Sequence, residues 1–256
     1  MDGSIYTLWL RDMKRFIRSE LRVATEFIRP LLWLGIIGIA LSSAFGNRIP
    51  GLPPSLDFLD LMTPGIIAMS MLFQGMFTGV AILWDKRFGF MKEILVAPIS
   101  RVSVMMGKML GGATIGIIQG VIIMIFAKFL GVPFPGALGF VQALILMLLI
   151  SFSFVSIGIS FASQMEDPET FPAVINFFIM PLFFLSGALY PIRTAPGWLQ
   201  TLAHFNPLAY GVDGLRSVTL SAWDSYFPLW MIWGVLIGFS TAVILIGSYL
   251  FSHMEM

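Results

Sequence analysis

Six long stretches of this 256-residue chain carry no charged side chain, and they determine the predicted fold. They cover residues 30–46, 61–84, 109–127, 139–162, 170–192 and 227–251. A bilayer core about 30 Å thick takes roughly 20 helical residues to cross, so each stretch is long enough once tilt is allowed. None alternates apolar and polar residues as the strands of a membrane barrel do. The pattern predicts an all-α polytopic membrane protein with six transmembrane helices.

The composition narrows the class of protein further. Hydrophobic residues make up 57% of the chain and charged residues only 11%, with a mean hydropathy of +0.89. Soluble domains carry about 25% charged residues, so a soluble enzyme or a nucleic-acid-binding protein is excluded. The chain has no Cys and two His, so we expect neither thiol chemistry nor a histidine-rich metal site.

The positions of the basic residues predict the topology. Eleven of the fifteen Lys and Arg residues lie before residue 30 or within residues 85–108. Cytoplasmic loops are enriched in Lys and Arg, so both of these segments are expected in the cytoplasm. An even number of crossings then places both termini there.

Residues 1–29 form a separate amphipathic pattern. At helical spacing their apolar residues fall on one arc, and Arg11, Arg15, Arg18 and Arg22 fall on the opposite arc. We expect one amphipathic helix in the headgroup plane, with its basic face toward the cytoplasm and anionic lipids. A cleavable signal would need a clean apolar segment before a small-residue cleavage site, which this stretch lacks.

The loop at residues 85–108 contains a second candidate interfacial element. Gly89 can end the preceding crossing helix, residues 90–97 can form two helical turns, and Pro98 then stops them. Met91, Ile94 and Leu95 would share one side of this short helix. Two interpretations remain open: the helix rests on its own membrane interface, or it docks a cytoplasmic partner.

Polar residues inside the crossings and in the opposite loop region are further candidates. Gln74, Thr78, Asn176 and Ser186 either bond to neighbouring helices or line a substrate path. Glycines four residues apart, at 75 and 79 and at 112, 116 and 120, favour close helix contacts. Residues 193–226 are mixed in polarity, and we expect two short re-entrant helices there.

Known catalytic motifs are missing. The sequence has no phosphate-binding G-x-x-x-x-G-K-[ST], no H-E-x-x-H and no G-x-S-x-G. No acidic or basic residue lies deep in a predicted crossing, so a proton relay has no candidate either. The protein is therefore expected to be no enzyme by itself, to bind no metal or cofactor, and to be passive or driven by a partner.

Three segments resemble one family, the type-2 ABC exporter permeases. They are residues 88–101 followed by Gly107 and Lys108, residues 184–192, and the run NPLAYGVDGLR at 206–216. The resemblance covers essentially the whole chain, which would form a single transmembrane domain over 1–256. It is closest to the bacterial and archaeal permeases of drug and nodulation-factor export.

The resemblance implies a complex in a prokaryotic cytoplasmic membrane. Two copies of the permease, a homodimer or a heterodimer, would sit on two ATPase subunits that bind ATP and Mg. Alternating access would move a lipid, a lipid-linked glycan or an amphipathic drug outward. A stand-alone channel or passive carrier and a membrane-embedded enzyme remain as alternatives.

The resemblance also implies roles for particular residues. The short helix after Gly89 is similar to the coupling helix that enters the ATPase, and residues 1–29 are similar to the connecting helix. The expected coupling residues are Arg87, Phe88, Gly89, Phe90, Met91, Lys92, Glu93, Ile94, Leu95, Pro98 and Arg101. The second and fifth crossings would line the pathway, with Ser186, Ala188 and Leu189 at an outer gate. The extracellular signature would comprise Asn206, Pro207, Tyr210, Asp213 and Arg216.

Overall fold

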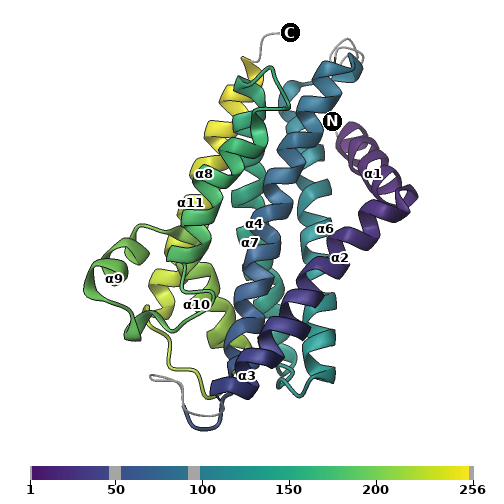
Figure 1. Cartoon of the computed structure of the whole chain (residues 1–256). Helices are drawn as coiled ribbons and strands as arrows, with labels where there is room; N and C mark the ends of the chain where they lie inside the picture. Colours follow the sequence, from purple (N-terminus) through teal and green to yellow (C-terminus); the bar gives the residue numbers. More distant parts are fainter. Residues whose placement is uncertain (1, 46–52, 92–98, 254–256) are drawn as a thin grey trace.

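A computed structural model describes residues 2–45, 53–91 and 99–253, without the side chains of residues 2, 45 and 174. Every regular element within these ranges is a helix (Figure 1). Five helical segments are long and apolar enough to cross a membrane. They are Glu20–Ala44, α4 (Phe58–Arg87), α6 (Arg101–Phe129), α7 (Ala137–Gln164) and α11 (Leu229–Ser252). The predicted all-helical membrane fold is confirmed at this level.

The fifth predicted crossing, residues 170–192, is shorter in the structure. Helix α8 (Phe171–Leu185) has 15 residues and therefore spans about 22 Å. The chain then turns and continues through a short 3₁₀ helix, Ile192–Thr194. Pro191 and the left-handed Gly187, with φ of 71°, stop the α-helix before the apolar run ends. The apolar run thus overestimates the length of this helix.

The N-terminal region also differs from the prediction. Residues 1–29 do not form one helix, because α1 (Asp2–Arg18) ends before Ser19, whose φ of −94° and ψ of 82° are not helical. Helix α2 (Glu20–Leu32) continues through a π-helix at Trp33–Gly38 into α3 (Ile39–Phe45). The first candidate span consequently begins at Glu20, ten residues before the predicted crossing. The amphipathic pattern continues across the break and did not reveal it.

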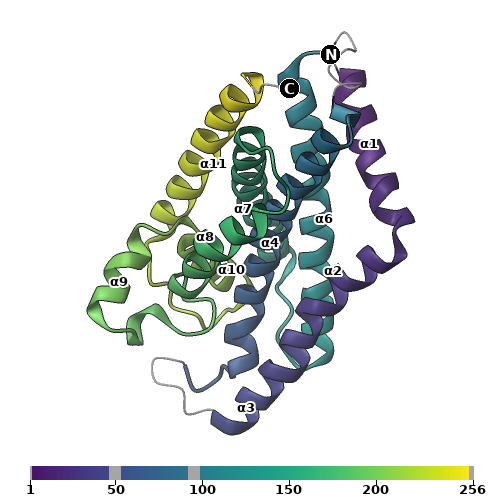
Figure 2. The same ribbon diagram turned by 45° about the horizontal axis from the view of Figure 1, so that its top comes forward.

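Helix α1 packs on α6, where it buries part of its apolar side. Leu8, Met13 and Phe16 are buried, and the Trp9 indole donates a hydrogen bond of 3.1 Å to the Thr114 hydroxyl. Figure 2 shows α1 running along the outside of the bundle beside α6. The contact with α6 accounts for these three apolar residues without a bilayer.

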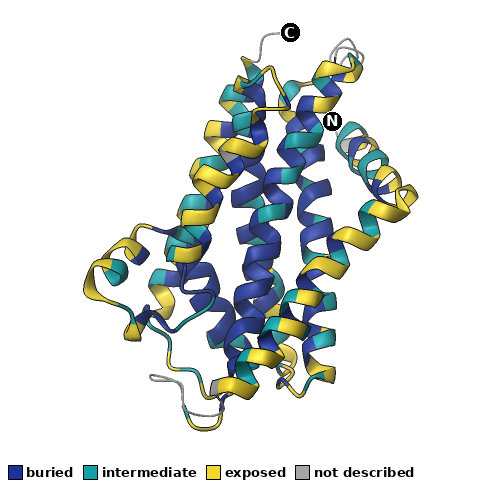
Figure 3. Ribbon diagram, in the orientation of Figure 1, coloured by how far each residue is buried: buried dark blue, intermediate teal, exposed yellow. Residues whose placement is uncertain are grey.

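Helix α4 lies at the centre of the molecule, between α6 and α7. Figure 3 shows it buried along most of its length, whereas α2 and α11 expose broad faces. Two short helices, α9 (Gly197–His204) and α10 (Pro207–Thr219), follow α8 as predicted for that region. Helix α10 is buried among α4, α7 and α11, and α9 lies at the periphery (Figure 1).

Glycines bring α4 close to α7, as their spacing predicts. A Cβ added at Gly75 would lie 2.5 Å from the Phe154 carbonyl carbon. A Cβ at Gly158 would collide with the Gly75 carbonyl oxygen, and one at Gly79 with the Gly158 carbonyl oxygen. Backbones that approach this closely gain van der Waals contacts that larger side chains would prevent.

We expect Gly75→Ala to lower the stability of the folded protein, because the neighbouring atoms belong to the backbone of α7 and cannot move aside. Overpacking of this kind costs about 1–3 kcal/mol. The measurement is the thermal midpoint in detergent, followed by size-exclusion chromatography. Gly234→Ala, in α11 with nothing within 4 Å of the added Cβ, is the matched control. Equal midpoints for the two variants would contradict the close contact.

Candidate functional site

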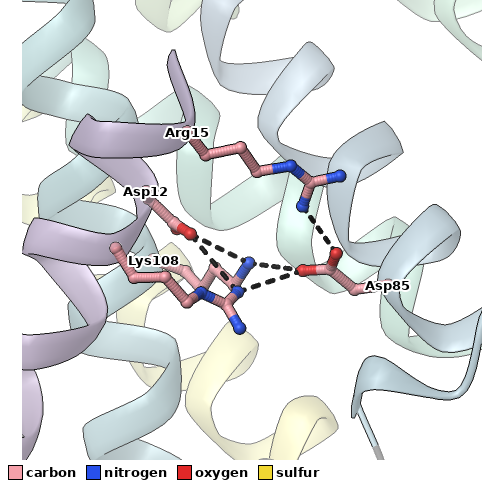
Figure 4. A network of polar contacts seen from close by, with 5 residues as sticks. Asp12, Arg15, Asp85 and Lys108 are labelled. Carbon is pink, nitrogen blue, oxygen red and sulfur yellow. Dashed lines mark hydrogen bonds and ion pairs between the residues drawn. The ribbon is translucent and has the colours of Figure 1, made fainter. Parts of the chain in front are cut away.

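A cluster of buried charges lies at the end of the bundle where α4 ends and α6 begins, here called the loop end. The Asp85 carboxylate in α4 accepts hydrogen bonds from Lys108 Nζ in α6 at 2.7 Å and from Arg15 in α1 at 2.7 Å (Figure 4). Arg11 adds a contact at 3.3 Å, and Asp12 pairs with Arg11 and Lys108. We call these five residues the ion network. It joins α1 to α4 and α6, which are about 70 to 96 residues further along the chain.

The burial of this network makes its charges interdependent. The side chains of Asp85 and Lys108 are each only 2% exposed. Charges removed from water are tolerated only when opposite charges and hydrogen bonds replace the lost hydration. Asp85 faces three cations, so it is the residue on which the charge balance depends most.

The same interaction explains why α6 is longer than predicted. Charge-free runs placed residues 85–108 in a loop, yet α6 begins at Arg101, after Ser100 accepts a hydrogen bond from the Ser103 amide at 3.1 Å. Lys108 is therefore two turns inside the helix. Its buried ammonium is neutralised by Asp85, which a search for uncharged stretches could not anticipate.

Other contacts hold neighbouring parts of the loop end. Lys86 Nζ donates to the Met165 carbonyl at 3.3 Å, and Arg87 pairs with the exposed Asp167 and Glu169 at 3.7 and 3.4 Å. Arg101 donates to the Ser252 carbonyl at the end of α11, at 2.7 Å. The end of α4 is thus in direct contact with the loop between α7 and α8, and the start of α6 with the end of α11.

The predicted coupling residues fall into three groups. Phe88 and Phe90 are 65% and 51% exposed, and Gly89 between them has a φ of 79°. Met91 is fully buried in the chain's own core, so it does not belong to an exposed apolar side. Lys92, Glu93, Ile94, Leu95 and Pro98 lie outside the described residues.

The predicted connecting-helix arginines do not share one role. Arg11 and Arg15 turn toward Asp85, although their side chains remain partly exposed. Arg18 is exposed, and the Arg22 guanidinium lies 5.8 Å from the centre of the Phe16 ring. The amphipathic pattern predicted a basic face toward the cytoplasm and anionic lipids, and it gave no indication that Arg11 and Arg15 pair with Asp85.

The predicted pathway residues separate in a similar way. Gln74 and Thr78 are buried where α4 meets α6 and α7, and the described residues offer the Gln74 amide no hydrogen-bond partner. Asn176 is exposed on α8, in a shallow groove also lined by Phe177, Phe178 and Phe184. Ser186 and Ala188 are buried, and Leu189 is half-buried.

The opposite end of the bundle brings two predicted motifs together at the end of α8. Ser186 donates to the Phe183 carbonyl at 2.6 Å and accepts from the Ala188 amide at 3.2 Å. From the other motif, Asn206 donates to the Leu182 carbonyl at 2.7 Å and caps α10 by accepting from Leu208 at 3.0 Å. Pro207 occupies the first position of α10, as its fixed φ favours.

Asp213 and Tyr210 hold the chain after α10 in place. The Asp213 carboxylate accepts from the Trp223 indole and from the Phe227 amide, each at 2.9 Å. Tyr210 donates to the His204 carbonyl at 3.0 Å and stacks on Phe227 with ring centres 4.0 Å apart. Both residues of the predicted signature therefore stabilise the fold around α10.

Arg216 is the most deeply buried cation of this end. Its guanidinium donates to the Leu61 carbonyl in α4 at 3.1 and 3.2 Å, to Gly187 at 2.8 Å and to Ala188 at 3.1 Å. The Trp223 ring lies 5.1 Å from its central carbon. Burial lowers the pKa of Arg216 to about 10, so the side chain remains charged at neutral pH. It joins α10, α4 and the end of α8.

The sequence pointed to Arg216 as a site residue and to Lys108 only as part of a resembling segment, and it gave no role to Asp12 or Asp85. The available signal was the position of Asp85 and Lys108 at opposite ends of one loop. The described residues contain no group of three or more His, Cys, Asp or Glu placed to hold a metal ion.

The chain is similar in sequence to membrane transport proteins. The family model described as "ABC-2 type transporter" matches residues 3–220. "Inner membrane transport permease YadH" of Escherichia coli K12 is 26% identical over 247 residues, covering 95% of this chain and 92% of that protein. "Putative transport permease ycf38" of Cyanophora paradoxa is 29% identical, covering 83% and 72%.

A third relative is "Probable multidrug ABC transporter permease YbhR" of Escherichia coli K12. It is 25% identical over 187 residues, which cover 70% of this chain and 50% of that protein. The family match spans most of the chain, including both ends of the bundle described above. The chain therefore belongs to the ABC-2 type transporter family and is a multi-pass membrane transport permease.

Proposed function

We propose that this chain is the membrane subunit of an ATP-driven exporter, working as two copies with two ATPase subunits that bind ATP and Mg. The observation that carries the proposal is the ion network at the base of the loop between α4 and α6. A loop that receives force from a partner needs a rigid connection to the helices behind it. The buried Asp85–Lys108 pair supplies that connection and extends it to α1.

Alternating access follows from this connection. Movement of the loop displaces the ends of α4 and α6 together, because separating them would break the bond between two buried charges, Asp85 and Lys108. ATP binding biases the permease only if it stabilises one of its two arrangements more than the other. A closed ATPase dimer, which draws the two loops toward each other, would provide that difference. The permease itself catalyses no covalent step.

The proposed orientation places the loop end in the cytoplasm. The segments with most of the Lys and Arg residues are α1 and residues 85–108, and α1 meets the described parts of the second segment, 85–91 and 99–108, at that end. Helix α1 begins and α11 ends there as well (Figures 1 and 2). Helix α8 with the residues after it serves as the fifth of six crossings along the chain, in addition to the five long helical segments. Helices α9 and α10 lie toward the exterior as the re-entrant region. YadH is named as an inner-membrane permease, and we propose the same membrane here.

The side chains on the exposed face of α8 favour an amphipathic molecule as the cargo. Phe177, Phe178 and Phe184 are exposed there beside Asn176, so the groove is aromatic with one polar group. Such a surface suits a lipid, a lipid-linked glycan or an amphipathic drug, and it could meet the same face of a second copy across the pathway. The multidrug permease named among the relatives agrees with the last class.

Reconstitution tests the proposal directly. The tagged chain is purified with the ATPase that accompanies it, and both are placed in liposomes with a fluorescent amphipathic dye or lipid. We expect uphill movement only with hydrolysable ATP and Mg. Rapid flux through liposomes that contain this chain alone would favour a passive channel and contradict the proposal.

We expect Phe88→Ala and Phe90→Ala to weaken ATPase binding, because both rings are exposed where the proposed partner docks. Truncating an aromatic anchor at an interface costs about 2 kcal/mol or more, so affinity should fall by about 30-fold or more. The measurement is ATPase retention on the immobilised permease. Phe129→Ala is the control, since that ring is 84% exposed at the other end of α6. Equal retention in all three variants would exclude docking at this loop.

Asp85→Asn should reduce transport per ATP hydrolysed and lower the thermal midpoint, because three cations lose their common partner. Breaking a buried pair in this way costs about 3 kcal/mol. Asp224→Asn is the control, since Asp224 pairs with Arg193 on the surface. The double variant Asp85→Asn/Lys108→Gln removes one unpaired cation and should regain part of the stability. Normal coupling in folded Asp85→Asn would rule out the connection.

A further inference from the structure

Arg216 links the proposed outer gate to the central helix. Its guanidinium bonds the Gly187 and Ala188 carbonyls directly after α8, and the same group bonds the Leu61 carbonyl in the first turn of α4. We propose that Arg216 is a positioning residue that holds residues 186–189 against α4 in the closed state. This inference rests on the proposed function in one respect, namely that residues 186–189 form the gate.

The last carbonyls of α8 have no partners within the helix, and three nearby side chains bond them instead of Arg216. Asn206 satisfies Leu182, Ser186 satisfies Phe183, and Tyr190 satisfies Phe184 at 2.8 Å. Ser186 and Tyr190 belong to the segment directly after α8, and Asn206 belongs to the start of α10; none of the three bonds α4 in these contacts. Arg216 differs from them because its bonds cross from α8 to α4.

Close packing at Gly65 makes this contact specific. A Cβ at Gly65 of α4 would collide with the Ala188 carbonyl oxygen and would lie 2.9 Å from its Cα. The backbone after α8 therefore rests directly on α4, beside the carbonyl that Arg216 bonds. Gly187 adopts a φ of 71°, which turns the chain so that its own carbonyl and that of Ala188 both face the guanidinium.

Arginine suits this position for a chemical reason. Its planar fork can reach several acceptors at once and remains charged when buried, whereas the lysine ammonium is a compact point charge on a flexible stem. The Trp223 ring beside the guanidinium, itself bonded to Asp213, fixes the plane of the fork. Arg216→Lys should therefore keep the charge but lose the simultaneous hold on α4 and α8.

The chain's lack of cysteine permits a direct test. Leu189→Cys, a half-buried site in the gate segment, is placed in the full-length protein, and its rate of reaction with a membrane-impermeant maleimide is measured in permeabilised membrane vesicles. We expect Arg216→Lys to raise that rate by about tenfold, the population change that loss of one charge-assisted bond produces. Trp198→Cys on the exposed α9 should react at the same rate with and without Arg216→Lys.

A second variant keeps the test decisive if Arg216→Lys does not accumulate. Gly65→Ala pushes the gate segment away from α4 without changing Arg216 and should also raise the rate at Leu189→Cys. Gly234→Ala, in open space on α11, is its matched control and should leave the rate unchanged.

Two results would overturn the inference: an unchanged rate at Leu189→Cys in the folded variants, or an equal rise at Trp198→Cys, which would indicate general loosening. The labelling needs no ATPase. A complex that fails to transport while showing the expected labelling would therefore refute the proposed function and retain the role of Arg216.

Discussion

Polar groups that leave water must find partners within the protein, and this constraint explains both functional ends of the bundle. At the loop end, Asp85 and Lys108 can be buried because each neutralises the other and α1 brings two more cations to the carboxylate. At the opposite end, the carbonyls after α8 can be buried because Arg216 and Asn206 donate to them. In both places the satisfying group comes from a distant part of the sequence. The constraint therefore fixes how helices pack, as well as how they cross the membrane.

The sequence predicted the helices best where they depend only on the transfer of apolar side chains out of water. The uncharged runs at 61–84 and 139–162 fall within α4 and α7, which extend only a few residues further, and α11 covers all but the first two residues of the run at 227–251. The prediction was wrong where a charge is buried with a partner. It began the third helix at Met109, directly after Lys108, whereas α6 already begins at Arg101. It was also wrong where local geometry interrupts an apolar or amphipathic run, at Ser19 and after Leu185.

The candidate sites were predictable as residue types but not as arrangements. The resemblance singled out Ser186, Asn206 and Arg216, yet no spacing along the chain indicates that the second motif caps the helix that ends at the first. Asp85 has no motif at all, and its importance appears only when three helices converge on it. The spacing of apolar residues indicates which side of a helix is buried. It does not indicate which residues from distant parts of the chain bond to each other.

Helix α4 connects the two ends, since Asp85 lies in its last turn and the Gly65 contact lies two turns from its start. The residues one helical turn away on the same side of α4, Leu61, Met62, Ala68 and Met69, carry side chains, so a shift of Ala188 by one turn along α4 would bring it against a side chain. The close contact at Gly65 therefore restricts how residues 186–189 can move relative to α4. Under the proposed function, residues 186–189 would separate from α4 more easily than they would slide along it, because sliding brings Ala188 against one of these side chains. Motion that arrives from the other end of α4 would then favour separation at this contact.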